Sequence, residues 1–152
     1  MEIGVSIEVK HWEELSKDDL YSLLQLRTAV FVVEQDCPYQ ECDGVDKVAF
    51  HVLIWEDDSL IGTSRIIPKS DDLISLGRIV VKKEKRVEGF GKLLMKTSLD
   101  YTISNLKPQK ITMSAQTYLI SFYSSFGFQT RGEEYLEDNI PHIRMELEIE
   151  AN

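Results

Sequence analysis

The feature that most constrains this chain is a change of hydrophobic period near its middle. The segment from Leu73 to Val81 ends in the β-branched run Ile79-Val80-Val81, which is typical of a strand. From Gly89 to about Asn105 the apolar positions instead recur at helical spacing. A strand therefore runs through a short turn into an amphipathic helix, and the turn lies at the N-terminus of that helix.

Elements of both periods alternate along the rest of the chain. We expect strands at Ile3 to Val9, Val48 to Trp55, Leu60 to Pro68, Leu73 to Val81, Lys110 to Ala115, Phe128 to Tyr135 and His142 to Ile149. We expect helices from the N-cap Ser16 to near Val33, from Gly89 to about Asn105 and from Leu119 to Phe126, and a turn at Asp138 to Pro141. The order β-α-β-β-β-α-β-α-β-β indicates an α/β (α+β) domain whose mostly antiparallel sheet is flanked by helices.

Length and charge limit the classes of protein that remain. The 152 residues correspond to a single domain, 1–152, without repeats or linkers. A net charge of −9 disfavours nucleic acid and anionic membranes as partners. The N-terminus lacks the basic and apolar regions of a signal peptide, and no apolar run approaches the ~18–20 residues that span a bilayer. We therefore expect a cytoplasmic protein.

The cysteines and one histidine are interpreted as structural. Cys37 and Cys42, spaced C-x4-C, are too few for a disulfide framework and do not form a familiar zinc motif, so we expect free thiols and no metal. His51 lies within an apolar strand, which favours a histidine that packs in the core over a ligand-binding one.

The turn between strand and helix has the sequence Arg86-Val87-Glu88-Gly89-Phe90-Gly91-Lys92, which contains R-x-x-G-x-G. A helix N-terminus offers unpaired N–H groups and a positive dipole end, and glycines let backbone approach phosphate oxygens closely. The pattern indicates a pyrophosphate-binding turn. A solvated glycine turn with a lysine-rich rim would have the same sequence pattern. Neither the Walker A motif nor G-x-G-x-x-G is present.

A second motif follows about 25 residues downstream, where the run 122–128 reads F-Y-x-x-F-G-F. Core packing alone would account for its phenylalanines. The two motifs in this order resemble the GCN5-related N-acetyltransferase (GNAT) superfamily. The segments 31–40, 43–46 and 140–143 resemble its ElaA-like subgroup, so the resemblance covers nearly the whole chain.

The resemblance implies a GNAT-type mixed sheet in which a splayed strand pair forms an acyl-CoA cleft. It implies acetyl-CoA as cosubstrate, with the pyrophosphate on the turn and the pantetheine arm along the preceding strand. The residues that it assigns to cofactor binding are Ile79, Val80, Val81, Arg86, Val87, Glu88, Gly89, Phe90, Gly91, Lys92 and, less directly, Gln116. Val87 departs from the glycine or asparagine that many members have, so contacts there would use backbone only.

The implied reaction is direct attack by a primary amine, of a small molecule or a protein, on the acetyl thioester. A backbone N–H near Val80 or Val81 would polarise the thioester carbonyl, and Tyr123 would protonate the leaving thiolate. Glu34 is the first candidate for general base and His142 the second; a solvated helix-terminal acid and a packing or capping histidine are the structural alternatives.

Three arginines lie on otherwise apolar elements. Arg65 and Arg78 are candidates for binding an acidic group of the acceptor, and His142 is a further acceptor-side candidate. For Arg27 we favour pairing with nearby acids. The net charge favours cationic amines, whereas the arginines would select an acidic group, so the acceptor stays open at this point.

Two other functions remain compatible with these patterns. One is a non-catalytic acyl-CoA-binding module. The other is an acyl-homoserine-lactone-synthase-like acyltransferase, because Leu26-Arg27-Thr28-Ala29-Val30-Phe31 is similar to the L-R-x-x-V-F run of such enzymes. Many GNAT proteins dimerise, which makes a homodimer one expectation, but no segment marks an interface.

Overall fold

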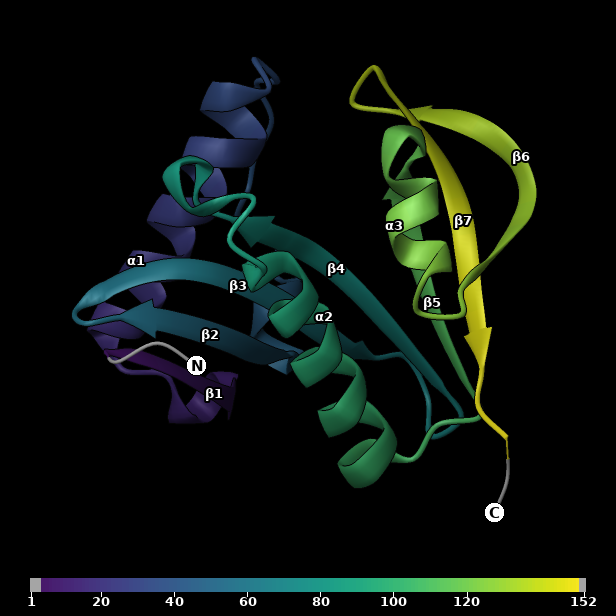
Figure 1. Ribbon diagram of the computed structural model, residues 1–152, viewed down its shortest axis with the longest axis horizontal. Helices are drawn as coiled ribbons and strands as arrows, with labels where there is room; N and C mark the ends of the chain where they lie inside the picture. Colours follow the sequence, from purple (N-terminus) through teal and green to yellow (C-terminus); the bar gives the residue numbers. More distant parts are fainter. Residues whose placement is uncertain (1–3, 151–152) are drawn as a thin grey trace.

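A seven-stranded sheet runs through the computed structural model, which describes residues 4–150 (Figure 1). The strands are β1 Val5–His11, β2 Phe50–Glu56, β3 Ser59–Pro68, β4 Leu73–Val81, β5 Lys110–Gln116, β6 Gln129–Glu137 and β7 Ile140–Glu148. They lie in the order β1-β2-β3-β4-β5-β7-β6. Only β4 and β5 pair in parallel. The predicted mixed, mostly antiparallel sheet is therefore confirmed.

Two long helical segments and a short helix cover the sheet. Helix α1 (Lys17–Arg27) continues as the π-helix η2 (Thr28–Glu34), α2 (Phe90–Tyr101) continues as the π-helix η5 (Thr102–Leu106), and α3 spans Ile120–Ser124. Short 3₁₀ helices are η1 Trp12–Glu14, η3 Val45–Val48, η4 Lys83–Lys85 and η6 Thr117–Leu119. Ser16 caps α1 as predicted, since its Oγ accepts from the N–H of Asp19 at 3.0 Å. Within residues 4–150, no helix is long and apolar enough to cross a bilayer.

A few predicted boundaries differ from the structure. Ile3, the expected start of the first strand, lies outside the described residues. Val48 ends η3, so β2 begins only at Phe50. Pro141 lies within β7, opposite Leu136, rather than in the turn. This is tolerated because β5 pairs with β7 only from His142 onward, so Pro141 loses no ladder hydrogen bond on that side.

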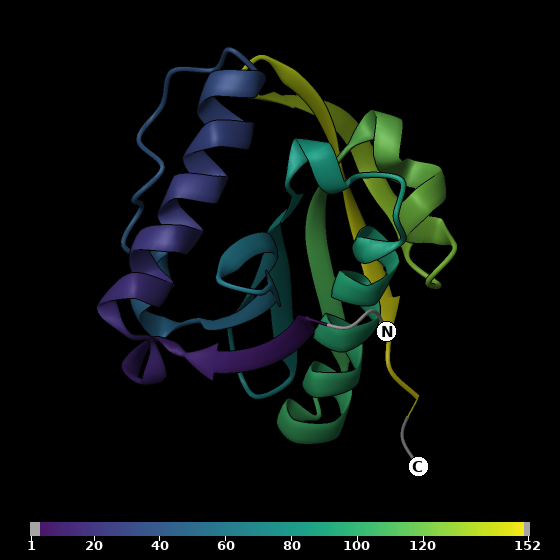
Figure 2. The same cartoon turned by 60° about the vertical axis from the view of Figure 1, so that its left-hand side comes forward.

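Helices α1 and α2 lie on different sides of the sheet (Figure 2), and an apolar cluster fills each of the two layers between helix and sheet. On β2, Val52 and Ile54 belong to the larger cluster beneath α2, whereas Leu53 belongs to the smaller cluster beneath α1. This alternation follows from the two-residue period of a strand. The helical contributions recur every three or four residues: Phe90, Leu94, Met95 and Leu99 from α2, and Leu23, Leu26 and Val30 from α1 and η2. Both layers therefore arise from the patterns that predicted the elements.

β4 and β5 stay together for only part of their length. Their register joins Leu73–Leu76 to Lys110–Met113 and then ends. Figure 1 shows the two strands diverging from this point. The predicted splayed strand pair is thus present, and it leaves the second half of β4 without a neighbour on its β5 side.

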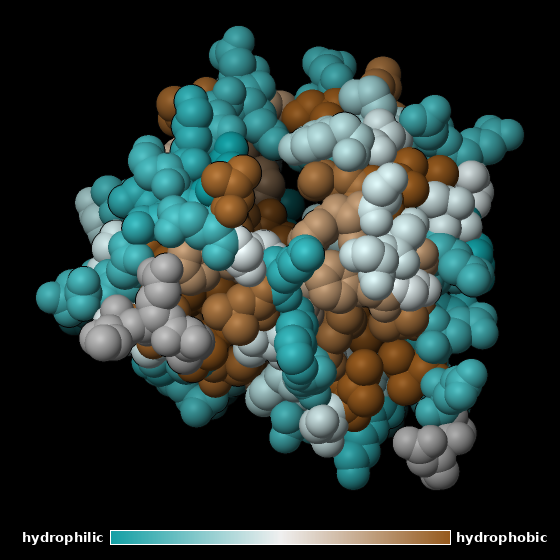
Figure 3. All heavy atoms as spheres, in the orientation of Figure 1, coloured by the Kyte–Doolittle hydropathy of each residue, from teal (hydrophilic) through white to brown (hydrophobic). Residues whose placement is uncertain are grey.

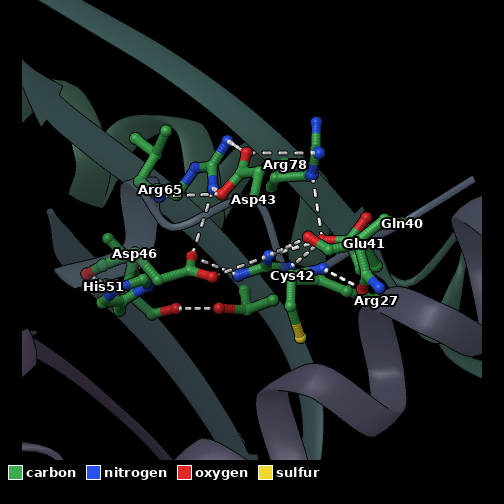
Figure 4. Close-up of polar contacts among 12 residues, drawn as sticks. Arg27, Gln40, Glu41, Cys42, Asp43, Asp46, His51, Arg65 and Arg78 are labelled. Atoms are coloured by element: carbon green, nitrogen blue, oxygen red, sulfur yellow. Dashed lines mark hydrogen bonds and ion pairs between the residues drawn. The ribbon is translucent and has the colours of Figure 1, made fainter.

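A buried ion-pair cluster ties α1 to the loop after η2 (Figure 4). Arg27 is 1% exposed and donates from Nε to Glu41 Oε2 at 2.6 Å and from Nη1 to Asp46 Oδ1 at 2.7 Å. Burial alone would raise the pKa of Asp46, but hydrogen bonds and charge from Arg27 and Arg65 outweigh it and hold that pKa below its ordinary value. The expected pairing of Arg27 with nearby acids is therefore present.

The same cluster extends to β3 and β4. Arg65 donates to both oxygens of Asp43 at 2.9 and 3.0 Å, and from Nη1 to Asp46 at 3.2 Å. Arg78 donates from Nε to Glu41 Oε2 at 3.0 Å. Three arginines thus share three carboxylates, which neutralises the cluster and fixes the loop 36–46 against the sheet.

The cluster predicts a large cost for removing one carboxylate. Asp46→Asn leaves Arg27 and Arg65 short of a buried counter-charge, so the free energy of unfolding should fall by about 3–5 kcal/mol. Urea unfolding at pH 7 measures this. Because the pKa of Asp46 is depressed in the folded state, its stabilisation should be present at pH 7 and lost as the pH falls below its unfolded value near 4.

The control is Asp58→Asn, at an exposed carboxylate outside the cluster, which should change stability by no more than about 0.5 kcal/mol. Equal unfolding midpoints for the two variants would contradict the structural role of the cluster.

Candidate active site

A cleft of about 660 Å³ opens where β4 and β5 part. Residues of η2 and the following loop line one wall, and residues of η6, α3 and the β6–β7 turn line the other. The face shown in Figure 3 is hollowed between these two parts of the molecule. The cleft lies at the place where the sequence predicted an acyl-CoA site.

Arg86 holds the turn at one end of the cleft. Its Nη1 and Nη2 donate to the two oxygens of Glu34 at 2.6 and 2.9 Å, and its Nε donates to the carbonyl oxygen of Val81 at 3.0 Å. Hydrogen bonds from Arg86 hold the pKa of Glu34 below its ordinary value. The predicted general base is therefore bonded at both oxygens across the mouth of the cleft.

The glycines of the turn differ in what they require. Gly89 has φ +86°, which favours glycine, and it caps α2. Gly91 has no such φ, and a Cβ there would meet only Phe122 Cζ at an ordinary 3.7 Å. Neither backbone conformation nor packing within the protein therefore demands glycine at this position. The space that a side chain would occupy is left open beside the helix N-terminus.

Val87 carries backbone strain within the same turn. Its φ is +67° and its side chain is fully exposed, so no packing compensates for a left-handed β-branched residue. Glycine and asparagine adopt a φ of this sign more readily than valine does.

The free edge of β4 presents backbone groups to the cleft. The N–H of Lys82 donates to Ile61 on β3 at 2.7 Å, so by strand alternation the N–H of Val81 points away from β3, toward the open edge. The carbonyl of Val81 faces the same way and accepts from Arg86. Of the two N–H groups predicted to polarise a carbonyl, that of Val81 is the one aimed into the cleft.

Tyr123 lines the cleft from α3 and is 5% exposed. Burial raises its pKa to about 12, so the phenol keeps its proton at neutral pH. Its ring packs edge-on against Phe122, and its hydroxyl has no hydrogen-bond partner among the described residues. A protonated, unpaired O–H is available to a ligand.

His142 lies on the same wall of the cleft as Tyr123, just after the β6–β7 turn. Its Nδ1 is 2.7 Å from the carbonyl oxygen of Ile140, and its Nε2 is 3.3 Å from Oε2 of Glu137. Because a carbonyl only accepts, Nδ1 carries the proton and Nε2 is the atom directed toward Glu137. The ring also stacks on Tyr135.

The two arginines predicted to bind substrate differ in their access to the cleft. Arg78 lines the cleft, with its guanidinium 5.9 Å from the ring centre of Phe31 and 5.7 Å from that of Tyr39. Arg65 is 5% exposed, pairs with Asp43 and Asp46, and is not among the cleft-lining residues. A ligand in the cleft therefore meets Arg78 but not Arg65.

The predicted cofactor-binding set is brought together in large part. Those that line the cleft are Ile79, Val80, Val81, Arg86, Val87, Gly91 and Gln116. Those that do not line it are Glu88, Gly89, Phe90 and Lys92. The side chain of Phe90 is in the core, so this part of the turn can contribute through its backbone.

Sequence reasoning missed the contacts at which the two walls touch. The thiol of Cys37 donates to the carbonyl of Asp138 at 3.3 Å, and the amides of Gln35 and Gln116 face each other at 3.5 Å. Cys37 is buried and Cys42 is exposed, and both are free thiols. His51 is buried and bonded to the carbonyl of Asp46, as expected of a core histidine. The contacts of Cys37 with Asp138 and of Gln35 with Gln116 join distant segments of the chain, so no local sequence motif indicates them.

Comparison with known proteins agrees with this geometry. A family model described as an acetyltransferase (GNAT) domain matches residues 15–149. Protein ElaA of Escherichia coli K12 is 44% identical over 143 residues, covering 91% of this chain and 94% of ElaA. The crystal structure of Escherichia coli ElaA superimposes with a TM-score of 0.90 at 40% identity, covering 95% and 99% of the two chains.

Two further solved structures are similar to this chain. An acyl-CoA N-acyltransferase from Pseudomonas aeruginosa has a TM-score of 0.90 at 39% identity, covering 94% of this chain and 99% of its own. The AHL synthase LasI has a TM-score of 0.74 at 15% identity, covering 95% and 89% of the two chains. The second likeness concerns the fold alone.

Strain at Val87 predicts that asparagine stabilises the protein. Val87→Asn places a residue that tolerates φ > 0 at an exposed site, so the free energy of unfolding should rise by about 1 kcal/mol and the midpoint by about 2–4 °C. Thermal unfolding measures this. Val33→Asn, at an exposed valine with helical backbone, is the matched control and should not stabilise. An equal effect of both substitutions would refute the strain.

Proposed function

Because the chain belongs to the GNAT acetyltransferase family, we propose that it is an N-acetyltransferase that moves the acetyl group of acetyl-CoA to a primary amine of a small molecule or a protein. The observation that supports this most is the convergence of three groups on one cleft: the open edge of β4, the turn at Arg86 and the hydroxyl of Tyr123. Each is needed for a different part of such a reaction.

The donor half of the cleft suits an extended ligand that ends in a diphosphate. Ile79 to Val81 offer backbone hydrogen bonds to the amides of a pantetheine arm, as an added strand would receive. The N-terminus of α2 and the open space at Gly91 suit the phosphates. When bound, acetyl-CoA supplies the activated thioester on which the amine acts.

The chain's residues then act on the charges that develop. The N–H of Val81 stabilises the oxyanion that forms as the amine nitrogen attacks the acetyl carbon. The C–N bond forms, the C–S bond breaks, and Tyr123 gives its proton to the thiolate. No covalent enzyme intermediate is required, and Tyr123 recovers its proton from solvent.

Proton removal from the amine falls to the acceptor lip. Glu34 is a weak base because Arg86 binds both of its oxygens and lowers its pKa, so we assign Glu34 to positioning Arg86. His142 is the better candidate, because it lines the cleft and no cation of the described residues binds its Nε2, which faces Glu137 at 3.3 Å.

Two alternatives make different predictions. A non-catalytic acyl-CoA-binding module would bind the donor without turnover. An enzyme similar to acyl-homoserine-lactone synthases would prefer an acyl carrier protein to free acetyl-CoA, and the likeness to LasI concerns the fold alone. Tyr123 favours the enzyme, because a binding module has no need of a buried, unpaired phenol.

The donor site predicts a ligand-induced rise in stability. Acetyl-CoA at about 100 times its dissociation constant should add about 2.7 kcal/mol, or roughly 5–10 °C, to the wild type in a thermal-shift titration. Gly91→Glu puts bulk and negative charge into the open space and should abolish the shift. Gly91→Ala fills less of that space and controls for the loss of glycine itself. A wild type that acetyl-CoA does not stabilise would overturn the proposal.

The acid role predicts a split between binding and turnover. Tyr123→Phe should leave the dissociation constant for acetyl-CoA nearly unchanged and lower kcat by about 10²-fold or more. Release of free CoA measures kcat, and calorimetry measures binding. Tyr21→Phe, at an exposed tyrosine on α1, is the control for loss of a phenol hydroxyl. Undiminished turnover in Tyr123→Phe would show that another group protonates the thiolate.

A further inference from the structure

The charges that line the cleft fall into paired and unpaired groups. Glu34 and Arg86 form a two-oxygen ion pair at the donor end. Arg78 is bonded to Glu41, which in turn is shared with Arg27. Neither pair leaves a net charge for a ligand.

Arg78 in particular is not a free cation. It belongs to the cluster in which three arginines face three carboxylates, and its Nη2 also lies 3.6 Å from Asp43. Its guanidinium also lies over the ring of Phe31 and over that of Tyr39. An acidic acceptor would therefore gain little from Arg78, because the arginine's charge is already balanced.

Two carboxylates remain at the acceptor lip. Glu137 ends β6 and Asp138 begins the turn to β7, and both line the cleft. Within residues 4–150, neither carboxylate forms an ion pair with an arginine or lysine. The one ionisable group that contacts them is His142, whose Nε2 lies 3.3 Å from Oε2 of Glu137. Even with protons on both ring nitrogens of His142, the lip keeps one net negative charge.

In the proposed reaction this lip belongs to the acceptor side of the cleft, because it carries His142, the candidate base. Cys37, on the opposite wall, donates from its thiol to the backbone carbonyl of Asp138 at 3.3 Å. Asp138 therefore lies against the opposite wall, at the opening of the cleft. Glu137 is half exposed and borders the same opening.

We propose that the acceptor is an aliphatic amine that carries a second positive charge, so that one nitrogen is acetylated while a cationic group is held by Glu137 and Asp138. This inference rests on the proposed function and assigns the substrate class of the same cleft. The reaction balances as before: the reacting nitrogen loses one proton, the leaving thiolate gains one, and the second nitrogen stays protonated.

Three amines of equal chain length test the second charge. 1,5-Diaminopentane, pentylamine and 5-aminopentanoate present the same reacting end with a cationic, neutral or anionic far end. At fixed ionic strength, kcat/KM should be about tenfold higher for the diamine than for pentylamine, and lowest for 5-aminopentanoate.

Substitutions at the lip test where the charge is recognised. Glu137→Gln and Asp138→Asn keep side-chain size, and asparagine tolerates the φ of +51° at position 138. Each should lower the ratio of kcat/KM for diamine over pentylamine severalfold, and the double variant should bring it near one. A defect in proton transfer slows both amines alike, so the ratio isolates the second charge.

Glu133→Gln and Glu134→Gln are the matched controls. These residues are exposed on the same strand, do not line the cleft and change the net charge by the same amount. They should leave the ratio unchanged, which separates local recognition from steering by the whole protein.

The outcomes distinguish this inference from the proposed function. If acetyl-CoA stabilises the protein but the diamine is acetylated no faster than pentylamine, or if the control variants lower the ratio as much as the lip variants, the inference is wrong and the proposed function stands. If acetyl-CoA does not bind, the proposed function itself fails.

Discussion

The unpaired edge of β4 beyond Leu76 is the constraint on which the rest of this molecule depends. Parallel pairing with β5 ends at Met113, and backbone polar groups inside a protein need partners. Arg86 supplies one to the carbonyl of Val81, while the N–H of Val81 stays directed at the cleft. The turn that begins at Arg86 is thereby fixed at the end of the open edge. For this reason the strand edge and the turn before α2 line one continuous side of the cleft.

The buried cluster around Arg27 gives this surface its second wall. Desolvated charges are tolerated only when paired, so Arg27, Arg65 and Arg78 draw Glu41, Asp43 and Asp46 inward and hold the loop between them. The same requirement leaves no excess charge on that wall. Glu137, at the half-exposed lip, keeps contact with water, so its carboxylate does not need an arginine or lysine partner to offset desolvation. The cost of burying an unpaired charge therefore explains both why the charges of this wall are paired and why the unpaired carboxylates lie at the exposed lip.

Backbone strain gathers at the same cleft. Arg78 and Val87 both have positive φ, at +47° and +67°, and both line it. At Arg78 the strained conformation is held by ion pairs and two aromatic rings, and it coincides with the irregular pairing of β3 and β4. At Val87 no side-chain packing compensates, because the valine is fully exposed. Conformations of this kind persist where a site requires a particular backbone path.

The sequence by itself determined the elements and their order, since the periods of two and 3.6 residues and the cap at Ser16 act over a few neighbouring positions. It also determined the turn from Arg86 to Gly91, because these residues are neighbours in the chain. Only the tertiary structure decided that Arg86 forms an ion pair with Glu34 and that Arg65 is buried beside Asp43. It also decided that Glu137 and Asp138 border the cleft. These contacts join segments that are far apart in the chain, so the local spacing of residues does not predict them.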